Sequence, residues 1–158
     1  MFDFDMLGLT PELRRALEAQ GFTRPTPIQN QAVPLAMDGH DVLGLAQTGT
    51  GKTLAFGLPL IAHLMEAPGK PAPGAAKALI LAPTRELVNQ IADSLRAFTR
   101  ETRIKVATVV GGQSINRQIG VMARGTDILV ATPGRLIDLM DRGAVDLGRT
   151  RFLVLDEA

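Results

Sequence analysis

Apolar and polar positions along the chain follow two patterns that alternate. Short apolar runs, typical of buried strands, are separated by longer amphipathic stretches, typical of helices with one buried face. The apolar runs predict strands at residues 42–46, 78–82, 104–110, 128–131 and 152–155. Strands that alternate with helices favour an α/β fold, in which a parallel sheet carries helices on both faces.

Capping residues and helix breakers locate the helices around these strands. Two threonine–proline pairs precede the first strand, and each combines a capping hydroxyl with a proline suited to the first helical position. The predicted helices are residues 10–21, 26–39, 52–65, 85–98 and 114–122, with a further helix that begins at residue 132. Residues 67–77, rich in proline, glycine and alanine, are predicted to form a surface loop within one domain, because the same alternation resumes after them.

The composition is that of a globular domain. The chain has 158 residues, of which 46% are hydrophobic and 21% charged. We expect residues 1–40 to form N-terminal helices and residues 41–158 to form the strand–helix part of a single domain. The net charge of +1 provides no overall attraction to nucleic acid, so a nucleic-acid site would be a local basic patch.

Several classes of protein are disfavoured. The chain has no cysteine and two isolated histidines, His40 and His63, which argues against thiolate chemistry and a zinc site. The start, MFDFDMLG, lacks the basic segment of a signal peptide, and the apolar run at 53–65 is too short to span a bilayer. We therefore expect a cytoplasmic protein without a membrane partner. With six phenylalanines and no other aromatic residue, any nucleic acid should be held by its backbone.

A phosphate-binding loop follows the first predicted strand. It comprises Ala46, Gln47, Thr48, Gly49, Thr50, Gly51, Lys52 and Thr53. Gly49 and Gly51 allow backbone N–H groups to face phosphates, and the next helix directs its positive end toward them. Lys52 is predicted to contact the outer phosphates, and Thr53 to ligate Mg²⁺. A chance glycine-rich turn is the alternative, which the strand before it and the helix after it disfavour.

Two adjacent carboxylates, Asp156 and Glu157, follow the apolar run at 152–155. An acidic pair is often just an exposed turn, but the preceding run is typical of a buried parallel strand. We predict that Asp156 holds Mg²⁺ and that Glu157 polarises the water that attacks a nucleoside triphosphate. With Lys52, these are the candidate catalytic residues.

Further candidate binding residues follow the other strands, at the edge where ligands of parallel sheets bind. They are Pro83, Thr84, Arg85, Gly111, Gly112, Thr132, Gly134 and Arg135. The threonines could simply be helix N-caps and the arginines simply solvated. The functional interpretation is that hydroxyls, helix-start N–H groups and arginines contact the phosphates of one strand. Arg117 and Arg124 could extend this patch, although surface solvation is the simpler expectation for both.

Taken in order, these motifs resemble the N-terminal RecA-like domain of a DEAD-box ATP-dependent RNA helicase. The matching segments are GFTRPTPIQ at 21–29 with Phe4 upstream, the phosphate loop, PTRELVNQ at 83–90, the glycine pair at 111–112, TPGR at 132–135 and VLDEA at 154–158. The resemblance implies a RecA-like P-loop NTPase fold, ATP and Mg²⁺ as cofactors, and sequence-independent binding of the RNA backbone. It also implies ATP hydrolysis coupled to local unwinding of RNA duplexes.

Gln29 has two interpretations. The segment 26–29 is a capping box, in which Gln29 would accept a hydrogen bond from the Thr26 backbone N–H. The resemblance instead implies that Gln29 reads adenine, with Phe22 and Arg24 beside the base; a glutamine amide can pair with N6 and N7 of adenine together.

The resemblance also implies that the chain stops within a motif, so the sheet is expected to be incomplete at its C-terminal end. A Ser-Ala-Thr motif and the second RecA-like lobe of the same parent chain would follow, and other ribonucleoprotein components are possible partners. Alone, the fragment is expected to be inactive. Two alternatives stay open: a non-catalytic ATP- and RNA-binding module, and another P-loop motor ATPase that acts on DNA.

Overall fold

The computed structural model describes residue 4 and residues 7–42, 51–67 and 69–156. The chain forms two compact units, the first made of residues 1–67 and 97–102 and the second of residues 68–96 and 103–158. The described helices are α1 (Pro11–Ala19), α2 (Pro27–Met37), α3 (Lys52–Glu66), α4 (Arg85–Thr99), α5 (Ile115–Met122) and α6 (Pro133–Asp141). The described strands are β1 (Ala76–Leu81), β2 (Val106–Val109), β3 (Thr126–Ala131) and β4 (Phe152–Leu155).

The first unit is helical in its described residues. Thr10 and Thr26 cap α1 and α2 through their side chains, as the threonine–proline pairs predict. Helix α3 is almost entirely apolar, and Leu58 and Ile61 in it are fully buried. Helix α2 packs against α3, and the ring Nε2 of His63 lies 2.9 Å from the carbonyl oxygen of Ala36. His63 therefore joins the two helices.

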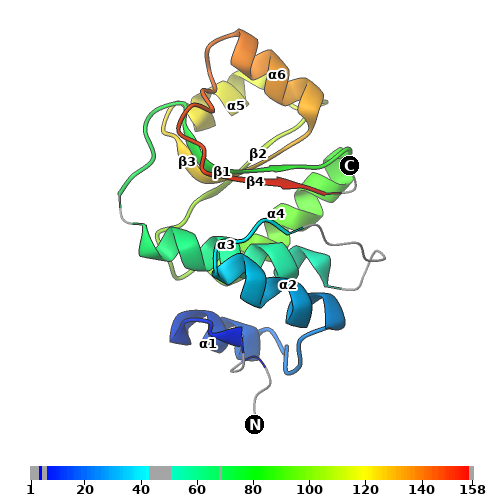
Figure 1. The fold of residues 1–158 in the computed structure, drawn as a ribbon. Helices are drawn as coiled ribbons and strands as arrows, with labels where there is room; N and C mark the ends of the chain where they lie inside the picture. Colours follow the sequence, from blue (N-terminus) through cyan, green and yellow to red (C-terminus); the bar gives the residue numbers. More distant parts are fainter. Residues whose placement is uncertain (1–3, 5–6, 43–50, 68, 157–158) are drawn as a thin grey trace. The chain divides into compact units, whose positions relative to one another are not determined.

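The second unit is built on a parallel sheet with the strand order β2-β3-β1-β4. Figure 1 shows α5 and α6 over one face of the sheet and α4 against the other. Alternate strand residues such as Val109 and Leu129 form a core with Met122 and Leu139 from the helices on the first face. The predicted α/β fold, with a parallel sheet and helices on both faces, is confirmed.

Some strand boundaries differ from the prediction. β1 begins at Ala76 rather than residue 78, so the predicted loop is shorter, and β3 begins at Thr126 rather than residue 128. Thr126 and Asp127 look like loop residues, yet both are buried because their side chains have partners. Thr126 donates to the carbonyl of Lys105, and the carboxylate of Asp127 accepts from the Lys105 N–H and pairs with Lys77.

Two other strand predictions have different outcomes. β2 covers residues 106–109 rather than 104–110. In β4 the side chains of Leu153 and Leu155 are 62% and 58% exposed, which corrects the expectation of a buried strand. β4 is an edge strand of the described sheet, and its side chains alternate between half-buried and exposed. Residues 43–46 of the first predicted strand lie outside the described residues. None of the described helices is long and apolar enough to cross a membrane.

Candidate functional site

The first cluster of candidate residues surrounds the start of α2. The side-chain oxygen of Gln29 accepts a hydrogen bond from the Thr26 N–H at 3.0 Å, and the Gln29 N–H donates to the Thr26 hydroxyl at 3.4 Å. This is the capping box that the local sequence predicts. The side-chain nitrogen Nε2 of Gln29 also donates a hydrogen bond to the carbonyl of Gly51 at 3.2 Å. Gln29, which is 1% exposed, therefore ties α2 to the last glycine of the phosphate loop.

Gly51 must be glycine in this arrangement. Its φ is +87°, a left-handed backbone conformation, and it occupies the N-cap position of α3. A Cβ at this position would lie 2.5 Å from Nε2 of Gln29 and 2.9 Å from the hydroxyl oxygen of Thr26. The close approach lets the Gln29 amide reach the Gly51 carbonyl.

Three other residues in or near this motif, two of them aromatic, have different environments. Phe22 is 40% exposed, and its ring centroid lies 6.1 Å from that of Phe98. Arg24 is exposed, whereas Phe4 is fully buried. Phe22 and Arg24 are thus accessible to a ligand, and Phe4 belongs to the core of the first unit.

The candidate phosphate and magnesium residues are divided between the two units. Lys52 and Thr53 are the first residues of α3 in the first unit. Asp156 directly follows β4 in the second unit, where its N–H donates to the carbonyl of Leu81 at 2.9 Å. Residues 46–50 of the phosphate loop and Glu157 lie outside the described residues. Within the described part of the chain, no group of three or more histidine, aspartate or glutamate residues could hold a metal ion. The hydroxyl of Thr53 and the carboxylate of Asp156 are nevertheless oxygen ligands of the type that Mg²⁺ prefers.

The second cluster lies where the parallel strands of the second unit end. The segment 83–85, with Pro83, Thr84 and Arg85, follows β1. A Cβ added to Gly112 would lie 2.8 Å from Nη1 of Arg85, so the two residues are close neighbours. Gly112 has a φ of +78° and lies three residues after the end of β2. The side-chain oxygen of Thr84 accepts from the Leu87 N–H at 3.2 Å, so Thr84 does cap α4. The structure therefore brings two of the predicted motifs into contact.

Arg135 connects a third motif to the same edge. Its Nη1 donates to the carbonyl of Gln113 at 2.8 Å and to the side-chain oxygen of Gln118 at 3.1 Å. A guanidinium carries five N–H donors, so these two bonds do not exhaust it. Thr132 occupies the N-cap position of α6, but its side chain makes no capping hydrogen bond to the described start of that helix. Gly134 is exposed.

Gln118 is an organising residue that the sequence motifs do not reveal. It is 5% exposed, and its Nε2 donates to the carbonyl of Val110 at 2.9 Å while its Oε1 accepts from Arg135. It thereby links the end of β2 to α6. The available signal is a glutamine four residues before Met122, on the buried side of an amphipathic helix.

Three comparisons relate this geometry to known proteins. A family model described as DEAD/DEAH box helicase matches residues 26–158. The chain is 47% identical over 154 residues to the pre-mRNA-processing ATP-dependent RNA helicase prp-5 of Neurospora crassa, covering 96% of this chain and 13% of that protein. It also matches the crystal structure of the RNA helicase Prp28 from Chaetomium thermophilum bound to ADP, with a TM-score of 0.90 and 39% identity, covering 99% of this chain and 38% of that one. The chain thus spans less than half the length of either relative.

Proposed function

The chain belongs to the DEAD/DEAH box helicase family, and we propose that it serves as the ATP- and RNA-binding lobe of an ATP-dependent RNA helicase. The observation that carries the proposal is the hydrogen bond from the Gln29 amide to the Gly51 carbonyl. It joins the motif expected to read the base to the loop expected to hold the phosphates. Residues 1–40 contribute the base-reading segment and residues 41–158 the RecA-like part, and a second lobe of the same parent protein completes both sites.

In this proposal each candidate residue has a defined role. Lys52 contacts the outer phosphates of ATP, and the positive end of α3 favours the same charge. Thr53 and Asp156 hold Mg²⁺, which neutralises charge on the phosphates when bound. Glu157 polarises the attacking water. The sequence order of these residues and the membership of the family support the assignment.

Gln29→Glu tests the adenine-reading role. Glutamate retains the oxygen that accepts from the Thr26 N–H, so the capping box is preserved, but the Nε2 donor is lost. We expect the original chain to bind ATP more tightly than GTP, and the variant to lose that preference by about tenfold or more, the value of one good bidentate base contact. Equilibrium titration with labelled ATP and GTP measures the ratio of affinities.

The ratio of ATP affinity to GTP affinity is the informative quantity, because the added negative charge weakens the binding of both nucleotides alike. Gln29 is 1% exposed, so contact with a base requires a small opening of its surroundings. Thr26→Val is the matched control, since it removes the capping hydroxyl and leaves the amide of Gln29 in place. An unchanged preference for ATP in Gln29→Glu would remove Gln29 from base recognition.

Arg135→Gln tests the proposed RNA contact. Glutamine keeps an amide N–H donor on a side chain two bonds shorter, and it removes the positive charge. We expect weaker binding of single-stranded RNA, to a similar extent on oligo-U and oligo-A, because phosphate contacts carry no base information. The slope of log affinity against log salt should fall by about 0.7, the value for one lost phosphate contact on a single strand.

Fluorescence anisotropy across a salt series measures this slope. Arg149→Gln, an exposed arginine of the same unit outside the proposed contacts, is the control and should leave the slope unchanged. A loss on only one of the two RNA sequences would show that Arg135 reads bases. Equal losses for both arginine variants would show a general charge effect.

A further inference from the structure

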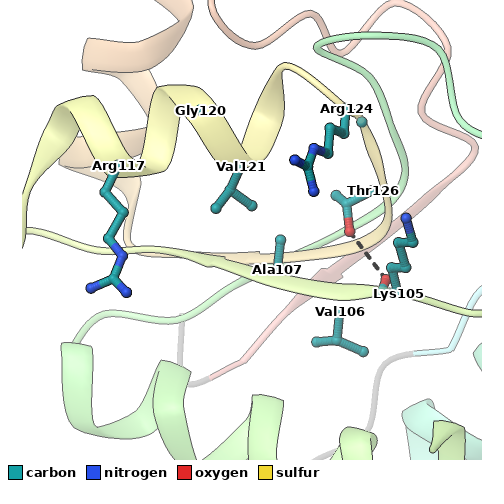
Figure 2. A pocket seen from close by; sticks show the side chains of 9 residues that line it. Lys105, Val106, Ala107, Arg117, Gly120, Val121, Arg124 and Thr126 are labelled. Atoms are coloured by element: carbon teal, nitrogen blue, oxygen red, sulfur yellow. Dashed lines mark hydrogen bonds between the residues drawn. The ribbon is translucent and has the colours of Figure 1, made fainter.

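A groove on the second unit lies along α5, beside the amino-terminal ends of β2 and β3. It runs between α5 and the start of β2 and encloses about 600 Å³ (Figure 2). Lys105 and Thr126, at the amino-terminal ends of β2 and β3, form one end of it. The proposed RNA contacts of this unit follow the carboxyl ends of the strands, at the opposite edge of the sheet. The end of the groove at Lys105, Arg124 and Thr126 therefore lies away from those contacts, while Arg117, in the first turn of α5, forms the other end.

The helix face that lines the groove has a regular composition. Arg117, Gly120 and Val121 are spaced i, i+3 and i+4, which places them on one side of α5, and Arg124 lies in the turn just after the helix ends at Met122. In Figure 2 the side chain of Val121 points from α5 toward β2, where that of Ala107 points back toward the helix. Val121 is 46% exposed, and a Cβ added to Gly120 would meet nothing within 4 Å. The middle of this face is thus apolar and open.

The charges of the groove all have the same sign. Lys105, Arg117 and Arg124 are exposed, and none of the residues that line the groove in the described structure is acidic. The carboxylate of Asp127, next to the lining residue Thr126, is buried and accepts from the Lys105 N–H at 2.8 Å while it pairs with Lys77 at 3.4 Å. It does not face a ligand in the groove. The site therefore combines an apolar centre with cations at both ends.

We propose that this groove binds an acidic amphipathic helix of a partner protein. Arg117 lies on α5 and Arg124 in the turn after it, on either side of Val121 in Figure 2. A partner helix with carboxylates seven residues apart, about 10.5 Å along its own axis, presents one toward each arginine. Apolar side chains between those carboxylates then pack on Val121 and in the space beside Gly120. Lys105 adds a third cation at one end.

An RNA strand fits the same surface less well. The lining contains no aromatic side chain on which a base could stack, and its centre offers aliphatic groups rather than donors. A strand that follows the proposed RNA contacts would also have to turn from the carboxyl ends of the sheet to its amino-terminal ends. The paired cations around an apolar centre favour a peptide with alternating acidic and apolar character over a polyanion.

The test uses a synthetic helical peptide that carries two glutamates seven residues apart, two leucines between them, and alanine and glutamine elsewhere. A matched peptide has lysines in place of the glutamates. Titrated into the isotopically labelled 158-residue chain, the glutamate peptide should shift backbone amide signals of residues 105–107 and 120–126, and the lysine peptide should not. The RNA contacts at 84–85 and 134–135 should stay unshifted, so the result does not depend on the proposed helicase function.

Charge reversal makes the test specific. The double variant Arg117→Glu, Arg124→Glu should bind the glutamate peptide at least about tenfold more weakly at low salt. The lysine peptide should bind this variant instead, which also shows that the variant is folded. Arg149→Glu makes the same kind of charge change outside the groove and should leave the binding of both peptides unchanged.

Three results would overturn the proposal. One is that neither peptide binds the original chain at the groove, and another is that both bind it equally. The third is that oligo-U shifts the amides of the groove and loses affinity in the double variant, which would make the groove part of the RNA site.

Discussion

Gly51→Ala is expected to eliminate measurable ATP binding and to lower the melting temperature of the chain. The new Cβ would lie 2.5 Å from Nε2 of Gln29 and 2.9 Å from the Thr26 hydroxyl oxygen, at a position whose φ is +87°. Relief of these contacts requires the Gln29 amide to move, which breaks its 3.2 Å hydrogen bond to the Gly51 carbonyl. The same movement separates the start of α2 from the phosphate loop. Nucleotide titration and a thermal melt of the same sample measure both effects.

Gly39→Ala is the matched control for this prediction. Gly39 has nearly the same φ, +86°, but a Cβ there would meet nothing within 4 Å. Both substitutions carry the conformational cost of a left-handed alanine, about 1–2 kcal/mol, so the difference between them isolates the contact with Gln29 and Thr26. If Gly39→Ala lowered ATP affinity as much as Gly51→Ala, general destabilisation would account for both.

Gly125→Ala is expected to destabilise the second unit more than any other single change proposed for it. Gly125 has a φ of +71°, and its Cβ would overlap the carbonyl oxygen of Ala72 and lie 3.1 Å from the Cβ of Pro71. The obstacle is backbone, which cannot rotate away. The segment is also held in place, because the Gly74 N–H donates to the Met122 carbonyl at 2.8 Å and the Thr126 N–H to the Ala75 carbonyl at 3.0 Å. We expect the free energy of unfolding to fall by about 3 kcal/mol.

Urea denaturation followed by circular dichroism measures this loss. Gly143→Ala is the control, since Gly143 has a φ of +73° and a Cβ there would meet nothing within 4 Å. It should lower the free energy of unfolding by about 1 kcal/mol, the conformational part alone. Equal midpoints for the two variants would mean that the loop at residues 71–72 moves aside without cost.

The elements of the fold follow from local signals along the chain. Thr10 and Thr26 cap their helices because a threonine before a proline satisfies an unpaired N–H and presets the first turn. The apolar runs became β1 and β3 because strands buried by helices on both faces select continuous apolar residues, whereas β4 formed from an apolar run although two of its side chains are exposed. These choices depend on neighbours in sequence, so the sequence predicts them well.

Strand boundaries and buried polar contacts are harder to predict from the local sequence. Thr126 and Asp127 extend β3 because Lys105 and Lys77, distant in sequence, satisfy their polar groups. Gln118 is buried for the same reason, since Val110 and Arg135 supply its partners. From the sequence alone, a polar residue is expected to lie on the surface, because the partners that would allow its burial are not known. No local pattern identifies such partners.

By itself, the sequence determined the alternation of strands and helices, the caps and the order of the motifs, since each depends on residues close along the chain. The tertiary structure determined which of those motifs are in contact. It showed that Gln29 serves the capping box and also bonds to Gly51, and that Arg85 lies against Gly112. It also decided that one face of α5 stays open beside β2. These contacts join residues far apart in sequence, and their geometry is set by packing.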